Sequence, residues 1–242
     1  INSKSGESAI MFDNGSYSSP TISLKKGMNR FIWNFRVDDI TMVKDVSFYG
    51  SYSGYRIGPD NYTVRLTIGE VSMDQPLIVK RDPRVEVKDR DNRTHQQMMS
   101  DLYIQINDLH SSISKARNIK TQIKKMNNEI EDMDNMNELL QTGRDVIQAL
   151  NEWEGDVIQT KMETFQDVVN FLNRLNSHMI NLLGTIDRSD PPLTQGQIDR
   201  YSDLTDEWYN YKKKLDEIID DQIRSYNELH RSAGLPAIII ND

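Results

Sequence analysis

The sequence predicts an α+β protein with two domains: a small Ig-like or fibronectin-III-like β-sandwich over residues 1–88, and an antiparallel bundle of three or four long helices over residues 89–242. Three observations lead to this fold class. Apolar side chains alternate with polar ones in the first part, whereas in the second they recur with heptad spacing. The charge also divides there, since residues 1–89 hold 12 basic and 11 acidic side chains and the remaining residues hold 17 and 26.

Two strands are expected ahead of residue 40. The run ESAIMF (7–12) is apolar and is followed by the turn-forming sequence Asp13-Asn14-Gly15. The run NRFIWNFRV (29–37) carries large apolar side chains at every second position, which is typical of a half-buried strand. These side chains are Phe31, Trp33, Phe35 and Val37.

A β-hairpin is expected next, because two alternating runs flank the dipeptide Gly69-Glu70. Glycine tolerates the positive φ of a two-residue turn, so this dipeptide favours a tight loop. Tyr62, Val64, Leu66 and Ile68 share one face of the first strand, and Val71 and Met73 lead into the return strand. A last strand is expected to begin at Leu77 and Val79, with Pro76 at a bulge or an edge. Several short strands within 90 residues predict the small sandwich.

The first helix is expected after Asp82-Pro83, which ends the β region. Thr94 with Gln97 has the spacing of a capping box. The apolar heptad positions are Leu102, Leu109, Ala116, Ile123 and Ile130, and the companion positions are Ile106 and Ile113, which become polar at Lys120 and Asn127. This pattern predicts a helix of about 40 residues.

Three more amphipathic segments follow. Asn135 with Glu138 predicts the start of the second helix, and Thr194 with Gln197 the start of the fourth. The expected core positions are Met136, Leu139, Val146, Leu150, Trp153 and Val157 in the second; Phe165, Val168, Leu172, Leu175, Met179, Leu182 and Ile186 in the third; and Tyr201, Leu204, Trp208, Tyr211, Leu215, Ile218, Tyr226 and Leu229 in the fourth. The pattern leaves open whether the second and third are separate helices or one bent leg of a three-helix bundle.

Composition and motifs argue against several functions. The acidic helical half disfavours nucleic-acid binding, which needs clustered Lys and Arg. The chain has no cysteine, and no apolar run approaches the roughly 20 residues of a membrane span. The four histidines are dispersed, and Glu152 and Glu154 point to different faces of a helix. Asp132, Asp134 and Asn135 lack the partners of a calcium loop and favour helix capping. We therefore expect no catalytic residue, no metal and no cofactor.

An aromatic segment, residues 48–62, is the one candidate binding site. Tyr49, Tyr52, Tyr55 and Arg56 lie within it among glycines. Aromatic side chains stack on sugar rings, and a guanidinium bonds hydroxyl or carboxylate groups. The alternative is that these tyrosines cover the edge of the sandwich or dock a neighbouring domain.

Three ordered motifs carry a family resemblance: KGMNRFIWNFR, then GPDNYTVRLTIG…QPLIVKRDPR, then TFQDVVNFLNRLN…LLGTIDRSDPPLT. They resemble the C-terminal region of large secreted bacterial β-propeller proteins, the sortilin-type or BNR (Asp-box) repeat, glycosyl-hydrolase-like proteins. In that family a G-x-N-R-F-x-W-D-x-R strand and a P-G-x-Y-x-V-x-L strand build a small Ig-like domain, and a helical region with a Q-D-x-x-N-F-P-x-x-L-N segment follows. The resemblance implies structural roles for Asn29, Arg30, Trp33, Tyr62, Gln166, Asp167, Asn170 and Asn176.

The sequence departs from the family pattern at three places. Asn34 stands where the family has Asp, and Asp60-Asn61 replaces a Pro-Gly turn. Leu172 replaces a proline, so the third helix is expected to continue through this position.

The resemblance implies a non-catalytic accessory module of a secreted or periplasmic protein from a Bacteroidota-like, Gram-negative bacterium. The chain opens at Ile1 without an initiator methionine and is expected to be a piece of a longer polypeptide. Its expected partners are an upstream β-propeller of the same polypeptide, where any hydrolase activity would lie, and a second copy or another protein that binds the helical bundle. The alternative is a carbohydrate-binding module that holds a glycan at residues 48–62.

Overall fold

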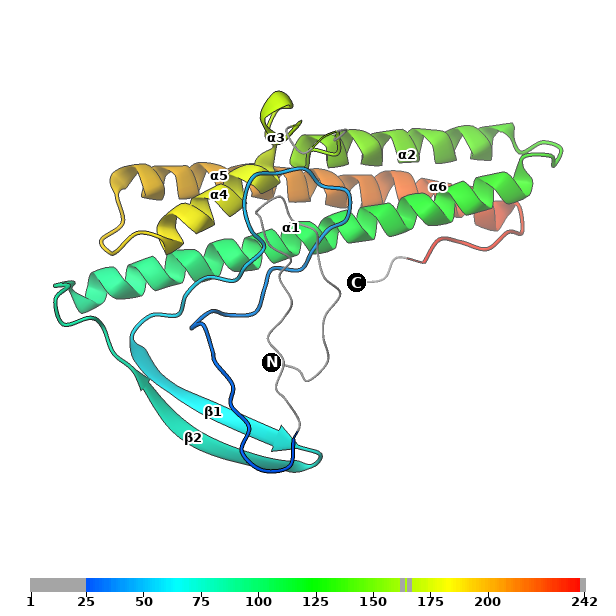
Figure 1. Cartoon of the computed structure of the whole chain (residues 1–242). Coiled ribbons are helices and arrows are strands. Elements are labelled where there is room, and N and C mark those ends of the chain that lie inside the picture. The colour runs from blue at the N-terminus through cyan, green and yellow to red at the C-terminus, as the bar shows by residue number, and fades with distance from the viewer. Residues whose placement is uncertain (1–24, 162–163, 165–166, 240–242) are drawn as a thin grey trace.

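A computed structural model describes residues 25–161, 164 and 167–239, and it shows an elongated helical bundle from which a β-hairpin projects (Figure 1). The bundle has three legs. The first leg is α1 (Asp89–Ile130), and the second is α2 (Asn137–Val157) followed by α4 (Leu175–Asp187). The third is α5 (Gln195–Glu217), η1 (Ile218–Ile223) and α6 (Arg224–Ser232). The sequence pattern left open whether the second and third predicted helices are separate or form one leg. In the structure they form one interrupted leg of a three-helix bundle.

The heptad pattern of α1 is confirmed. All seven of its expected apolar positions are buried: Leu102, Ile106, Leu109, Ile113, Ala116, Ile123 and Ile130. The expected start at Thr94 is wrong, because the helix begins at Asp89 and the Thr94 hydroxyl donates to the Arg90 carbonyl within it. Two indole groups join the legs around this core, since Trp153 Nε1 donates to the Tyr211 carbonyl at 2.8 Å and Trp208 Nε1 donates to Asp108 Oδ2 at 3.2 Å.

The expectation that the third helix continues through Leu172 is wrong. Only the short α3 (Asp167–Asn170) forms before α4, and Leu172 is 70% exposed. Tertiary contacts hold this segment out of the helical conformation, because the Ser47 amide donates to the Gln159 carbonyl at 2.7 Å and Gln159 Nε2 donates to the Leu172 carbonyl at 3.0 Å. The break is thus caused by the chain packed beside it.

The third leg begins as expected and then changes pitch. Thr194 and Gln197 form a complete capping box, which confirms the predicted start of the fourth helical segment. Beyond Glu217 the helix widens into the π-helical η1. The buried positions Ile218 and Ile223 are five residues apart here, a spacing that one wider turn brings back onto the core face.

The predicted β-sandwich is wrong: within the described residues the one sheet is a two-stranded antiparallel hairpin of β1 (Asp60–Ile68) and β2 (Val71–Val79). Ile68 pairs with Val71 around Gly69-Glu70, which confirms the predicted turn, and Gly69 has φ of 60°. β2 runs through Pro76 as one strand, so the expected last strand is part of it. The expected strand at 7–12 lies outside the described residues.

Residues 29–37 do not form the predicted strand. Phe35 has φ of 60°, which breaks the alternation of side chains, and only an isolated bridge pairs Arg36 with Arg56. The chain continues as a segment that we call the arm, residues 36–57. Its two halves lie side by side, since the Val37 amide donates to the Tyr55 carbonyl at 3.1 Å and the Ile40 amide to the Tyr52 carbonyl at 2.7 Å.

The arm packs on the helices and shares their core. Its buried side chains are Ile40, Val43, Phe48 and Tyr52, and they belong to the same apolar cluster as the α1 and α4 positions. Hydrogen bonds add to this contact, because the Thr41 amide donates to Asn107 Oδ1 and Arg117 Nη1 donates to the Lys44 carbonyl. The arm therefore belongs structurally to the bundle, whereas the hairpin beyond it does not.

Alanine substitutions at two glycines of α2 are expected to change stability in opposite directions. A Cβ at Gly143 would lie 2.6 Å from the Asn127 side-chain amide and 2.8 Å from the Tyr226 ring, whereas a Cβ at Gly155 would meet nothing within 4 Å. We expect Gly143→Ala to lower the free energy of unfolding by about 1–3 kcal/mol through overpacking. Gly155→Ala should raise it by up to about 1 kcal/mol through helix propensity. Urea denaturation measures the change in the free energy of unfolding of each variant, and two changes of the same sign would contradict this expectation.

Candidate interaction surface

The hairpin carries one apolar and one polar face. Register and alternation place ten side chains together on what we call the hairpin face: Asp60, Tyr62, Val64, Leu66, Ile68, Val71, Met73, Gln75, Leu77 and Val79. The opposite face is polar, with an ion pair in which Arg65 Nε donates to Asp74 Oδ1 at 2.8 Å and a hydroxyl contact of 2.9 Å between Thr67 and Ser72. This opposite face also carries Pro76 and the exposed Ile78, so the segregation is clear near the turn and weaker toward the base.

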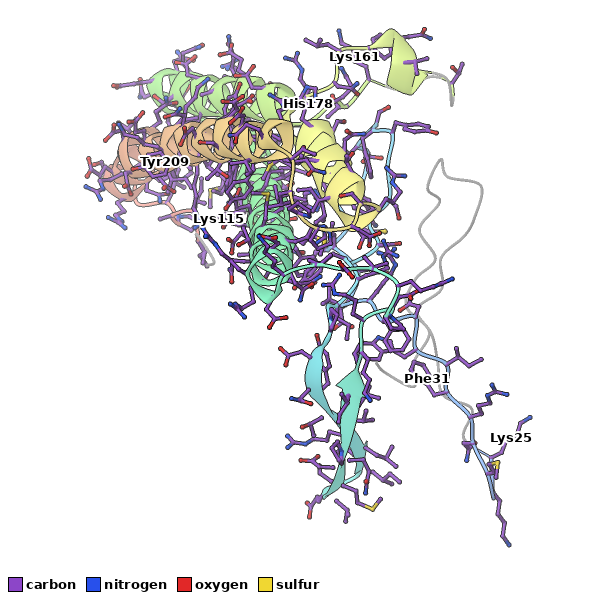
Figure 2. The ribbon with its side chains drawn as sticks, turned by 90° about the vertical axis from the view of Figure 1, so that its left-hand side faces the viewer. Lys25, Phe31, Lys115, Lys161, His178 and Tyr209 are labelled. Carbon is purple, nitrogen blue, oxygen red and sulfur yellow. The ribbon has the colours of Figure 1, made fainter. Side chains whose placement is uncertain are left out.

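The hairpin face is open to solvent. Ile68 is 65% exposed, Val71 62% and Met73 52%, and Figure 2 shows the hairpin extending away from the helices. Two nine-residue strands present a face of about 300 Å² from the strand rise and spacing. The largest apolar patch on a typical monomer is about this size and is often functional, and a lone two-stranded hairpin is marginally stable in water. The hairpin face is therefore the strongest candidate functional surface.

The base of the hairpin is capped by two aromatic side chains that the sequence singled out. The Trp33 ring lies 6.5 Å from that of Tyr62 and 5.2 Å from that of Phe35. Trp33 Nε1 donates to the Arg36 carbonyl at 2.9 Å, and the Tyr62 hydroxyl donates to the Gly58 carbonyl at 2.8 Å. Trp33 is half-buried here and does not lie in a sandwich core.

A charged cluster ties the hairpin and the arm to the bundle. Asp187, at the end of α4, is buried and accepts hydrogen bonds from Arg36 Nη2 at 2.9 Å and from the Arg56 amide at 2.7 Å. The Arg56 guanidinium donates to the Asp187 carbonyl, and Arg36 Nη1 donates to the Gly54 carbonyl at 2.6 Å. We call this group the Asp187 clamp. It fixes both ends of the arm to one helix terminus just before the chain enters β1.

The four predicted sugar-contact residues do not form a common platform. Tyr52 is buried against Phe48 and His110, and this burial raises the pKa of Tyr52 to about 12. Tyr55 packs edge-on against Tyr103 with 5.7 Å between ring centroids, and Arg56 belongs to the clamp. Tyr49 alone of the four is largely exposed, at 71%.

The remaining residues implied by the family resemblance are scattered. Asn29 closes a local turn, since its side chain accepts from the Lys25 amide at 3.0 Å and donates to the Lys25 carbonyl at 2.9 Å. Arg30 is exposed. Asp167 and Asn170 bound α3, Asn176 is buried in α4, and Gln166 lies outside the described residues.

Sequence reasoning missed a buried polar network beneath the arm. His110 on α1 contacts the Thr41 carbonyl through Nδ1 and the Asn176 side chain through Nε2 at 2.7 Å. Burial lowers the pKa of His110 and so favours the neutral ring, which carries one N–H for two facing oxygens, the Thr41 carbonyl and Asn176 Oδ1. The signal in the sequence is weak: His110 is one residue beyond the heptad position Leu109.

A second missed cluster joins the first two legs. Glu154 on α2 accepts from Arg117 Nε at 2.7 Å and from the Lys120 ammonium, both on α1. A lysine at the heptad position of Lys120, where an apolar residue is expected, is the signal that could have found it.

The described ranges contain no group of three or more metal-ligating side chains close enough to hold an ion. None of the helices in those ranges is both long and apolar enough to cross a membrane.

The histidines make stability depend on pH. Burial lowers the pKa of His95, His110, His178 and His230 below the ordinary value of 6.5. Below pH 6.5 the unfolded chain then binds more protons than the folded one, so the free energy of unfolding falls as pH falls toward the folded pKa values. We expect urea denaturation to show lower stability at pH 5.5 than at pH 7, with a smaller difference in His110→Gln. A flat or reversed pH dependence would contradict this.

Comparison of the chain with models of known protein families, with curated proteins and with solved structures finds no match.

Proposed function

We propose that this chain is a non-catalytic accessory module whose helical bundle presents the hairpin for contact with another protein surface. The observation that carries the proposal is the exposed hairpin face, with apolar side chains at eight of its ten positions. Burying such side chains contributes about 25 cal/mol per Å², so the free energy for association is available on this face.

Rigid attachment supports a presenting role. α1 is 42 residues long, or about 60 Å, and forms a stiff support with the other two legs. The Asp187 clamp and the Trp33–Tyr62 contact restrain the hairpin at its base. A restrained hairpin loses little conformational entropy on binding, which favours affinity.

A protein partner is favoured over a sugar. A glycan site needs several exposed rings close together, and of the predicted set only Tyr49 is largely exposed. The hairpin face, by contrast, is mostly aliphatic, with Tyr62 at its base and Gln75 as the one amide side chain on it.

The motif resemblance suggests the partner and its location. We infer that the hairpin face docks on an upstream β-propeller of the same polypeptide, in a secreted or periplasmic protein of a Gram-negative bacterium. Hydrolase activity, where the parent protein has it, would then lie in the propeller. This inference requires the coding sequence ahead of Ile1 to encode a β-propeller, and a reading frame without one would overturn it.

Replacing Leu66 with Lys tests the contact. We expect Leu66→Lys to weaken binding to the separately produced upstream propeller by about tenfold or more, since it loses apolar burial and places a charge in the contact. Isothermal titration calorimetry measures the affinity. Ser72→Lys is the matched control, because it places the same charge on the polar face, in the strand β2 next to Met73, which pairs with Leu66. Equal affinity of the two variants would contradict the proposal.

A further inference from the structure

We propose that the partner engages the hairpin by adding a β-strand to the outer edge of β1, and not to that of β2. This inference rests on the proposed function and names how the partner binds. It follows from an asymmetry between the two edges of the hairpin.

The register decides which backbone groups face outward. In a hairpin with a two-residue loop the closing pair, here Ile68–Val71, is hydrogen-bonded, and hydrogen-bonded and non-hydrogen-bonded pairs then alternate. Thr63, Arg65 and Thr67 therefore occupy non-hydrogen-bonded positions and direct their N–H and C=O groups away from β2. Among the described residues no backbone partner bonds these groups. From Thr63 to Thr67 the outer edge of β1 is an intact row of donors and acceptors, whereas the Asn61 amide at its start donates to Asp60 Oδ1.

The outer edge of β2 is interrupted in its middle. Pro76 pairs with Thr63 at one of the same non-hydrogen-bonded positions. Its nitrogen faces outward and carries no hydrogen, so the β1–β2 ladder loses nothing but the outer edge lacks a donor. If a partner strand were added to β2, the partner carbonyl opposite Pro76 would have no N–H donor, at a cost of about 1–3 kcal/mol. Proline at such a position is a common protection of an edge strand.

The same geometry specifies the partner strand. Its alternate side chains on one side continue the hairpin face and are apolar and β-branched. Those on the other side lie beside Thr63, Arg65 and Thr67, so hydroxyl side chains and a carboxylate near Arg65 are favoured. The partner is therefore an extended segment with alternating apolar and polar residues at the margin of its own sheet.

A second copy of this chain meets the requirement less well: paired through its own β1 about Arg65, it would place two like charges opposite each other where a carboxylate is favoured, and packed face to face it buries too little area. Two hairpin faces of about 300 Å² each would bury roughly 600 Å² when packed together. Stable interfaces bury about 1,200 Å² or more. Strand addition instead brings the neighbouring strands of the partner's sheet alongside the hairpin, and main-chain hydrogen bonds supply affinity.

Amide exchange measured by NMR tests the inference on the unmodified chain. The probe is a synthetic peptide as long as β1 that alternates threonine and valine and carries a central glutamate on the threonine side. At saturating peptide we expect exchange at Thr63, Arg65 and Thr67 to slow by about tenfold or more, with Ser72, Asp74 and Ile78 unchanged. Protection of the β2 edge, or of neither edge, would overturn strand addition at β1.

Two proline variants give a second readout. Thr67→Pro and Ser72→Pro alter the two members of one cross-strand pair, and each removes an outward N–H and the same hydroxyl contact. We expect Thr67→Pro to weaken peptide binding by about tenfold and Ser72→Pro to leave it nearly unchanged. If Leu66→Lys weakens propeller binding while Thr67→Pro has no effect on the peptide, the contact role stands and strand addition fails. If Leu66→Lys does not weaken propeller binding either, both strand addition and the proposed function are wrong.

Discussion

Glu154→Gln is expected to lower the free energy of unfolding by about 3 kcal/mol, the effect of removing one partner from a buried ion pair. Glu154 is 6% exposed, and it receives hydrogen bonds from Arg117 and Lys120 on the facing helix. Neutralising the carboxylate leaves two cations close together, and the Lys120 side chain is only 13% exposed. The desolvation of that ammonium is then uncompensated.

Urea denaturation followed by far-UV circular dichroism measures this loss. Glu152→Gln is the matched control, since Glu152 lies on the same helix, is exposed, and bonds only Gln148 among the described residues. The control should change stability by less than about 0.5 kcal/mol. A loss below about 1 kcal/mol in Glu154→Gln would show that water reaches the cluster.

Asp187→Ala is expected to release the arm from the bundle and to cost about 3 kcal/mol. The substitution removes the acceptor of Arg36 Nη2 and of the Arg56 amide at once. Hydrogen bonds to a charged group contribute about 1.5–3 kcal/mol each, and solvent around the partly exposed Arg56 side chain offsets part of the loss.

Amide exchange distinguishes local release from global destabilisation. We expect the amides of Val37, Ile40 and Ile57, which bond across the arm, to exchange faster in Asp187→Ala relative to the buried helical positions of α1. Asp190→Ala, an exposed aspartate three residues on, should leave both stability and exchange unchanged. Uniform acceleration throughout the chain would mean that the clamp contributes to the whole fold and does not specifically anchor the arm.

Local signals predicted the helical periodicity well but the helix starts less well, since α1 begins at Asp89 and not at Thr94, and α2 has Met136 and not Asn135 as its N-cap. The heptads of α1 are buried as expected, and the Thr194 capping box starts α5. These features depend on residues three to seven positions apart, which a helix brings together without help from the rest of the chain. The Gly69-Glu70 turn belongs to the same class, because its register follows from the two flanking strands.

Features that depend on distant contacts were predicted poorly. Residues 29–37 alternate like a strand, yet Phe35 has a positive φ, and Trp33 packs against both Phe35 and Tyr62. The helix break before α4 contains no proline and is held by the contact of Ser47 with Gln159, more than a hundred residues apart. Neither contact is accompanied by a periodic pattern in the sequence from which it could be predicted.

The sequence predicted which residues share the candidate surface, but not that this surface is exposed to solvent. Alternation placed Tyr62, Val64, Leu66 and Ile68 on one face, and the hairpin register confirms that they share it. The inference that this face lies in a sandwich core was wrong, because alternation reports which side chains are together and not what covers them. The buried roles of His110 and Glu154 were missed for a related reason, since a buried polar residue is recognised only through its partners.

The π turn of η1 constrains where residues can be inserted into or deleted from the third leg. An α-helix advances 100° per residue, so the additional residue that the wider turn accommodates sets the rotation of everything after it. Deleting one residue from Ile218–Ile223 would restore an ordinary helix and turn α6 by about 100°, carrying Tyr226 away from Asn127 and Asn227 away from Ile238. Insertions and deletions in the last leg are therefore coupled to η1, and among homologues they should occur there in compensating pairs.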